Sequence, residues 1–206
     1  MTKTLLINCY IKSEKNVELH AAVKKHSQVT VVPYREVESG FELEGFDAVV
    51  LSGSEARIVK AEDRVRYSGV SELIKKCNLP ILGICFGHQL LCSTFGAKTG
   101  SLTQPVIDRF EQVRLLQVCE LFDGFNDGQA VPLAQYHNDY VLKEGLEEAG
   151  FCLIADSVTC EVEAVRHKTN PFYGCQFHPE RITIKKETHS EGHTIIENFY
   201  NNTVKR

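Results

Sequence analysis

The stretch that most constrains the fold is PILGICFGHQLL, residues 80–91. An apolar run typical of a buried strand ends near Gly83, and a helix-forming run begins at Gly87, so that Cys85 lies between two glycines. A G-x-nucleophile-x-G pattern between a strand and a helix is typical of a nucleophile elbow, in which the reactive side chain occupies a strained turn. A buried cysteine at an ordinary strand-to-helix turn is the alternative, and the stretch alone is compatible with both.

Strand-like and helix-like runs alternate throughout the first half of the chain. The predicted strands are residues 3–10, 28–34, 46–54 and 79–85. The predicted helices are residues 14–26, 65–77 and 87–97, the last of which should stop at Gly96. This alternation favours a parallel sheet that is covered by helices on both faces.

The second half of the chain has a different pattern. Short apolar runs separated by Gly, Asp, Asn and Pro predict added strands, some of them antiparallel, and residues 191–202 predict a closing helix. Because the 206 residues contain no linker or internal repeat, we expect a single domain over residues 1–206. The predicted fold class is α/β: a three-layer, mostly parallel Rossmann-like (flavodoxin-like) sheet with added antiparallel strands. In such sheets ligands bind at the carboxyl ends of the strands.

Composition and charge exclude several classes of partner. The net charge is −4 and no basic block stands out, so we expect neither a nucleic-acid-binding nor a membrane-binding surface. No apolar run approaches the ~20 residues needed to span a bilayer, and the N-terminus lacks the features of a signal peptide. Eight cysteines without a secretory signal or a C-x-x-C pair predict free thiols and a cytoplasmic location.

A candidate base for Cys85 lies in the motif QFHPE. His178 ends an apolar strand, and Glu180 lies two residues later on the same face, where its carboxylate can orient the imidazole. Cys85, His178 and Glu180 would then form a variant of the nucleophile–histidine–carboxylate triad. A structural histidine–glutamate pair at a strand end is the alternative.

Other motifs carry weaker signals. The loop Ser52-Gly53-Ser54 follows an apolar strand and can direct backbone N–H groups at an oxyanion, although an ordinary turn is the alternative. His189 and His193 have an i, i+4 spacing that some metal sites use. Because a glycine lies between them and no third ligand is evident, we expect a solvated helix start and no metal site.

Together, GICFGHQLL and QFHPE strongly resemble the class I (triad) glutamine amidotransferases. The resemblance extends from about residue 51 to the closing helix. It implies that Cys85 attacks the side-chain amide of glutamine, that His178 acts as general base and acid, and that Glu180 orients His178. It also implies hydrolysis to glutamate and ammonia without a metal or an organic cofactor.

The resemblance implies further oxyanion and substrate-binding positions, namely Gly53, Ser54, Phe86, Gln89, Asn138 and Asp139. The oxyanion donors would be the N–H groups of Phe86 and of position 54, where serine replaces the glycine of the family. Serine can serve there if the loop conformation does not demand glycine. Gln89 matches a glutamine-binding position, and the backbone at Asn138 and Asp139 would hold the α-amino and α-carboxylate groups of the substrate.

The ammonia acceptor is the open question. The run before QFHPE and the segment HNDYV resemble the glutaminase of GMP synthases, which implies glutamine as substrate and, as partner, a separate ATP-pyrophosphatase (synthetase) subunit. Three departures, NCYIKSEKN after the first strand, LSGS in place of LSGGP and a longer segment after HPE, also fit stand-alone amidotransferases. A free-standing γ-glutamyl hydrolase or peptidase is therefore the second hypothesis. A non-catalytic module is the third, and the intact triad disfavours it.

Overall fold

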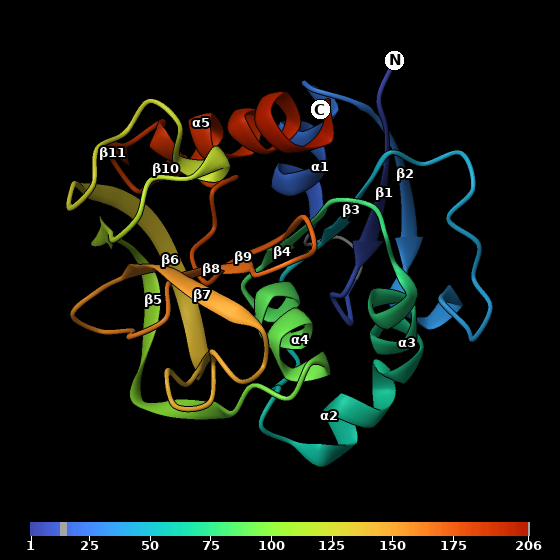
Figure 1. Cartoon of the computed structure of the whole chain (residues 1–206). Helices are drawn as coiled ribbons and strands as arrows, with labels where there is room; N and C mark the ends of the chain where they lie inside the picture. Colours follow the sequence, from blue (N-terminus) through green and yellow to red (C-terminus); the bar gives the residue numbers. More distant parts are fainter. Residues whose placement is uncertain (13–15, 206) are drawn as a thin grey trace.

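The computed structural model describes residues 1–12 and 16–205 (Figure 1). Within these residues, nine strands form one sheet in the order β2-β1-β3-β4-β9-β8-β7-β5-β6. The strands are β1 Lys3–Asn8, β2 Gln28–Pro33, β3 Ala48–Leu51, β4 Ile81–Ile84, β5 Thr99–Leu115, β6 Ala130–Val141, β7 Phe151–Asp156, β8 Ala164–His167 and β9 Phe172–Cys175. A separate hairpin, β10 (Thr183–Ile184) and β11 (Glu187–Thr188), lies in the polar segment after the HPE motif.

The helices are α1 Val17–Lys24, α2 Ala61–Arg66, α3 Ser68–Lys76, α4 Phe86–Thr94 and α5 Glu191–Asn198. The predicted start of the first helix, at Glu14, lies outside the described residues. The prediction of one helix over residues 65–77 is wrong, because the backbone leaves the helical region at Tyr67 and divides α2 from α3. After α5 the chain continues as a π-helical segment over Phe199–Val204.

Helices cover both faces of the parallel part of the sheet, as the sequence predicts. Leu5 and Ile7 of β1 join the core beneath α3 and α4, whereas Leu6 joins the core beneath α1 and α5. Figure 1 shows these two helix layers on opposite sides of the sheet. The alternation follows from the two-residue period of a strand, which directs successive side chains to opposite faces. The three-layer α/β prediction is confirmed.

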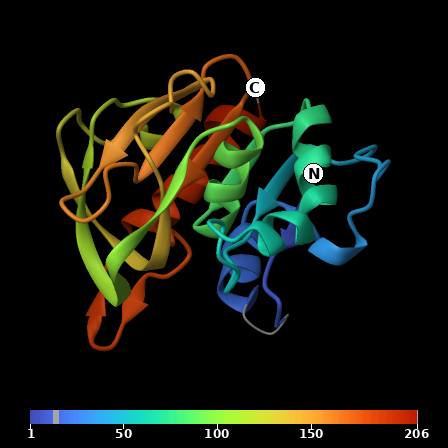
Figure 2. The same cartoon turned by 90° about the horizontal axis from the view of Figure 1, so that it is seen from below.

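The sheet divides into a parallel and an antiparallel half. Strands β2, β1, β3, β4 and β9 pair in parallel, whereas β9, β8, β7, β5 and β6 pair antiparallel. The antiparallel half curls beside the parallel half (Figure 2). The curl returns β6 to the end of β9, where the His178 N–H donates to Ala134 O at 2.8 Å. It thereby carries residues of β6 to the carboxyl ends of the parallel strands.

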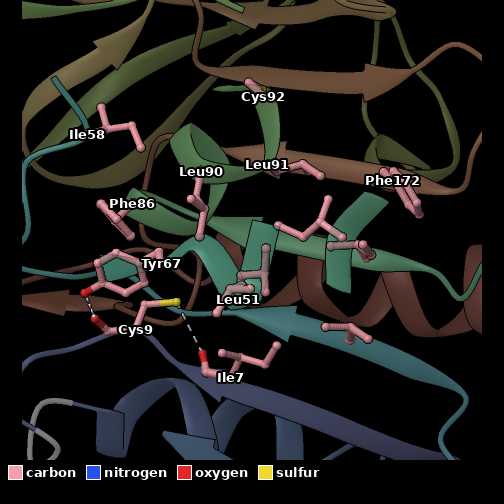
Figure 3. Packing of buried hydrophobic residues seen from close by; sticks show 14 of the residues in the cluster. Ile7, Cys9, Leu51, Ile58, Tyr67, Phe86, Leu90, Leu91, Cys92 and Phe172 are labelled. Atoms are coloured by element: carbon pink, nitrogen blue, oxygen red, sulfur yellow. Dashed lines mark hydrogen bonds between the residues drawn. The ribbon is translucent and has the colours of Figure 1, made fainter. Parts of the chain in front are cut away.

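A buried tyrosine joins two loops at these strand ends. The Tyr67 hydroxyl donates to Cys9 O at 2.5 Å (Figure 3) and lies 3.0 Å from Ser54 Oγ. Its ring packs on Phe86 with a centroid separation of 4.6 Å. Tyr67 therefore fixes the loops after β1 and β3 relative to the start of α4.

The cysteines and the helices also bear on the surroundings in which the chain folds. All eight cysteines are free thiols. Among the helices that the structure describes, none has the length and apolar character to cross a bilayer.

Candidate active site

The turn between β4 and α4 has the geometry of an elbow. Cys85 has φ 51° and ψ −105°, a conformation that non-glycine residues rarely adopt. A Cβ atom added at Gly83 would lie 2.7 Å from Gly87 O, and one added at Gly87 would lie 2.4 Å from Leu51 O. Both flanking positions therefore require glycine for close strand–helix packing, and the turn presents Cys85 at the end of β4.

His178 and Glu180 form a buried pair just after β9. His178 Nδ1 lies 2.8 Å from Glu180 Oε1, and both side chains are about 5% exposed. Burial lowers the pKa of His178, but the negative charges of Glu180 and of Cys85 as a thiolate outweigh burial and raise that pKa well above its ordinary value. Nε2 of His178 has no hydrogen-bond partner of normal geometry among the described residues. The surroundings thus favour an imidazolium that lies beside Cys85.

Two glutamine side chains, linked by hydrogen bonds, connect the Cys85 sulfur to the backbone of β6. Gln89 Nε2 donates to Asp139 O at 2.6 Å and to Gln176 Oε1 at 3.1 Å, and Gln176 Nε2 approaches Cys85 Sγ at 3.7 Å. The Cys85 thiol also approaches Tyr136 O at 3.6 Å. Sequence reasoning missed Gln176, although its position two residues before His178 in a strand-like run places both on one face.

These side chains open into a cavity of about 460 Å³. Its lining residues are Tyr10, Glu18, Ser54, Glu55, Cys85, Asp108, Tyr136, His178, Glu180 and Arg181. Sequence reasoning found Ser54 and the three triad residues and missed the other six. Those six come from loops, helix α1, strand β6 and an irregularity of β5, and no periodicity in the sequence places them together at the site.

Two of the missed residues owe their positions to local backbone features. Asp108 has φ 44° at an irregularity of β5, and its carboxylate accepts from Arg181 Nη2 at 2.8 Å. Tyr10 follows β1, and burial, aided by the charges of Glu180 and Cys85, raises the pKa of its hydroxyl. The cavity wall therefore combines acidic groups, one guanidinium and two tyrosines.

The loop after β3 meets the condition for an oxyanion donor. Among the described non-glycine residues, positive φ values occur at Cys85, Asp108 and Lys185, so Ser54 has an ordinary backbone conformation and glycine is not demanded there. A Cβ atom added at Gly53 would lie 2.9 Å from Tyr10 Oη and 3.2 Å from His178 Cε1. A side chain at position 53 would therefore press on Tyr10 and on His178. The Phe86 N–H is the first amide of α4 and has no intrahelical acceptor.

Of the six predicted oxyanion and substrate-binding residues, only Ser54 lines the cavity, and the side chains of three others are engaged elsewhere. Gln89 is buried, with its amide committed to Asp139 O and Gln176. The Asp139 carboxylate accepts from Arg57 Nε at 2.8 Å and from Ser101 Oγ at 2.9 Å. The Asn138 amide oxygen, oriented to satisfy its neighbours, also accepts from Arg57. The side chains of Asn138 and Asp139 thus converge on Arg57, which lies in the loop after Ser54.

A second cysteine–histidine–glutamate set lies away from this cavity. His137, Cys160 and Glu163 are all buried, and their donor atoms lie within 4.8 Å of one another. Burial lowers the pKa of His137 to about 4, raises the pKa of Glu163 to about 7 and raises the pKa of Cys160 well above its ordinary value. Sequence reasoning did not identify this set, which we call the sealed cluster.

Comparison with known proteins agrees with this geometry. A family model described as glutamine amidotransferase class-I matches residues 5–202. The chain belongs to the class I glutamine amidotransferases. It is accordingly a glutamine amidotransferase enzyme.

Sequence comparison shows similarity to one kind of amidotransferase subunit. The chain is 35% identical over 157 residues to the glutamine-hydrolysing GMP synthase subunit of Methanothermobacter thermautotrophicus, an alignment that covers 75% of this chain and 77% of that protein. It is 34% identical over 175 residues to the corresponding subunit of Methanocaldococcus jannaschii, which covers 81% and 78% of the two chains.

Solved structures show the same fold. A Thermoplasma acidophilum protein described as a GMP synthase subunit superimposes with a TM-score of 0.83 at 28% identity, covering 100% of this chain and 95% of that one. A glutamine amidotransferase from Thermotoga maritima superimposes with a TM-score of 0.68 at 20% identity, over 87% and 76% of the two chains. This second likeness concerns the fold alone.

Proposed function

We propose that Cys85, His178 and Glu180 are the catalytic residues of this amidotransferase, within a single glutaminase domain over residues 1–206. The observation that carries the proposal is their convergence on one cavity, with Cys85 at a strained elbow and His178 bonded to Glu180. A thiolate is the reactive form of a cysteine nucleophile, and an adjacent imidazolium stabilises it. The raised pKa of His178 supports this charge arrangement.

The chemistry follows from these positions. The Cys85 sulfur adds to the side-chain carbonyl carbon of glutamine, and the resulting oxyanion accepts from the N–H groups of Phe86 and Ser54. His178 then protonates the departing nitrogen, so that ammonia leaves and a γ-glutamyl thioester remains. Water, deprotonated by His178, attacks the thioester to release glutamate and the thiol. Glu180 keeps the imidazole oriented throughout.

Replacement of the nucleophile tests the proposal. Purified Cys85→Ala should form no glutamate above background from glutamine, while its far-UV circular dichroism matches that of the native chain. Retention of glutaminase activity by this variant would show that another residue is the nucleophile.

For the ammonia acceptor, we propose a separate ATP-dependent synthetase subunit of the GMP synthase type, in the cytoplasm. The support is the similarity to glutamine-hydrolysing GMP synthase subunits over three quarters or more of the chain. Free thiols at all eight cysteines are consistent with a reducing compartment.

Titration with a synthetase subunit tests this partner. Glutaminase activity of the isolated chain should rise sharply when the nucleotide-loaded synthetase is added. Robust turnover of γ-glutamyl peptides by the isolated chain, with no response to the synthetase, would instead support the free-standing hydrolase.

A further inference from the structure

We propose that the sealed cluster, His137, Cys160 and Glu163, is a site for a divalent transition-metal ion of the Zn²⁺ type. Three donor atoms of different chemistry, an imidazole nitrogen, a sulfur and a carboxylate oxygen, lie within 4.8 Å of one another. Tetrahedral Zn²⁺ with bonds of about 2.0–2.3 Å needs its donors about 3.5 Å apart. Metal binding would therefore draw these three donor atoms closer together.

The orientation of His137 supports the site. The residue is 5% exposed, and its Nδ1 lies 3.3 Å from Asp139 O, the orientation in which an Nδ1–H donates to a backbone carbonyl. That tautomer leaves a lone pair on Nε2, which has no hydrogen-bond partner among the described residues. Metal-ligating histidines usually donate their other ring N–H to such a carbonyl. His137 therefore combines an unpartnered, buried Nε2 with a place beside a thiol and a carboxylate, which suits a metal ligand.

Glu163 is held in place by a polar shell. Gln135 Nε2 donates to both carboxylate oxygens at 2.9 Å, and Ser157 Oγ donates to Oε1 at 2.7 Å. Bonds of this kind orient a ligating carboxylate and leave lone pairs available to a metal. Cys160 Sγ approaches Val162 O at 3.3 Å, so this thiol rotates from a weak hydrogen bond to reach a metal.

Charge balance favours a dication here. Binding of M²⁺ converts the Cys160 thiol to a thiolate and the Glu163 carboxyl to a carboxylate, and the displaced protons pass to solvent. One dication, one thiolate and one carboxylate sum to zero, so no net charge is buried. The soft sulfur together with imidazole selects Zn²⁺ or Co²⁺ over Mg²⁺ or Ca²⁺.

The position of the cluster gives the metal a structural role. His137 belongs to β6, whereas Cys160 and Glu163 precede β8, and β6 and β8 share no ladder pairing within the described residues. A metal would bridge these strands and close the curl of the antiparallel half. Val158, in the turn that carries Cys160, is fully exposed, so local opening of this turn offers an entry path.

Cobalt and zinc titrations of the full chain test the site. Because Cys85 and His178 could also bind metal, the titrations use Cys85→Ser as the background. Added Co²⁺ should produce a thiolate-to-cobalt charge-transfer absorption, and equilibrium dialysis should find one Zn²⁺ per chain. Cys85→Ser/Cys160→Ser should lose the absorption, whereas the matched control Cys85→Ser/Cys152→Ser should keep it.

A second variant guards against misfolding. Glu163→Gln, measured in the same background, should weaken Zn²⁺ binding by at least about tenfold, while far-UV circular dichroism without metal shows that the chain remains folded. Absence of stoichiometric binding in Cys85→Ser, or an absorption that survives loss of Cys160, would overturn the proposal. Neither result bears on the glutaminase assignment, which is measured on metal-stripped protein.

Discussion

Two sets of the same three residue types have opposite surroundings in this molecule. Cys85, His178 and Glu180 face a cavity of about 460 Å³, and His178 is paired with the Glu180 carboxylate at 2.8 Å. In the sealed cluster, His137 bonds to a backbone carbonyl, and Glu163 bonds to an amide and a hydroxyl. The first histidine has a raised pKa, whereas burial lowers the pKa of the second.

The comparison shows that the partner, more than the residue type, sets the charge of a buried histidine. Both rings are strongly buried, and burial alone disfavours the imidazolium. The Glu180 carboxylate overcomes this cost because it contacts the ring directly, whereas Glu163 is engaged by neutral donors. Cys85, His178 and Glu180 are thereby arranged for nucleophilic chemistry. In the sealed cluster burial favours the neutral forms, and the proposed metal ion would replace the protons.

The largest expected difference between the two sets is in catalysis. Cys85→Ala should lower kcat by about 10⁴-fold or more, since it removes the nucleophile. Cys160→Ala should leave kcat within a few-fold, because Cys160 does not line the cavity. Steady-state glutamate release by the two purified variants measures both effects. Comparable losses of kcat in the two variants would show that the two cysteines do not differ in their importance for catalysis.

Removal of the Glu180 charge should give the next largest effect. Glu180→Gln should lower kcat by about 10²-fold or more and should move the pKa of His178 back toward its ordinary value, because burial then acts without an opposing carboxylate. The control is Glu163→Gln, which should leave the His178 titration unchanged. The pKa values are measured from imidazole chemical shifts in NMR titrations.

The same substitution has a consequence for stability. Because the folded pKa of His178 is raised above the unfolded value of about 6.5, the stabilisation from the pair is complete below that value and is lost as the pH rises through the folded pKa. Glu180→Gln should remove this pH-dependent part of the free energy of unfolding. Denaturant titrations at pH values across this range measure the free energy of unfolding of the native chain and of Glu180→Gln. If that free energy depends on pH in the same way in both proteins, the pairing of His178 with Glu180 is contradicted.

A smaller effect is expected in the hydrogen-bond shell of the sealed cluster. Ser157→Ala removes the donor to Glu163 Oε1 and should lower the free energy of unfolding by about 1–2 kcal/mol, with kcat unchanged. Urea denaturation combined with a glutaminase assay measures both quantities. A loss of activity without a loss of stability would tie the cluster to catalysis.

The smallest effect is expected at the oxyanion loop. Ser54→Gly should change kcat by no more than a few-fold, because the proposed donor is the backbone N–H and the residue has no positive φ. Gly53→Ala is the contrasting variant, since its Cβ would lie 3.2 Å from His178 Cε1. A large loss in Ser54→Gly alone would show that the serine side chain matters through its contact with Tyr67.

Sequence reasoning succeeded where periodicity and local chemistry coincide. The elbow at Cys85 followed from a strand, two glycines and a helix in direct succession, and the His178–Glu180 pair followed from the two-residue period of a strand. The fold class followed in the same way from alternating runs. These features are encoded within a few neighbouring residues, so one sequence suffices to predict them.

Features that depend on distant contacts could not be predicted in this way. Tyr67, where the helix breaks, donates its hydroxyl to Cys9 O, 58 positions away along the chain. The contacts of Gln89 are another example, because its Nε2 donates to Asp139 O and to Gln176 Oε1, residues that the curl of β6 and the end of β9 bring to it. The sealed cluster joins β6 to the segment before β8, and no local pattern marks that meeting.

The most direct test of the central claim is selective trapping of the nucleophile. The folded protein is incubated with an electrophilic analogue of glutamine, and the adduct is located by peptide mass spectrometry. We expect one adduct per chain, on Cys85, with Cys160 unmodified unless the protein is first unfolded. An adduct on Cys160, or complete inactivation with Cys85 unmodified, would contradict the assignment of Cys85, His178 and Glu180 as the catalytic residues.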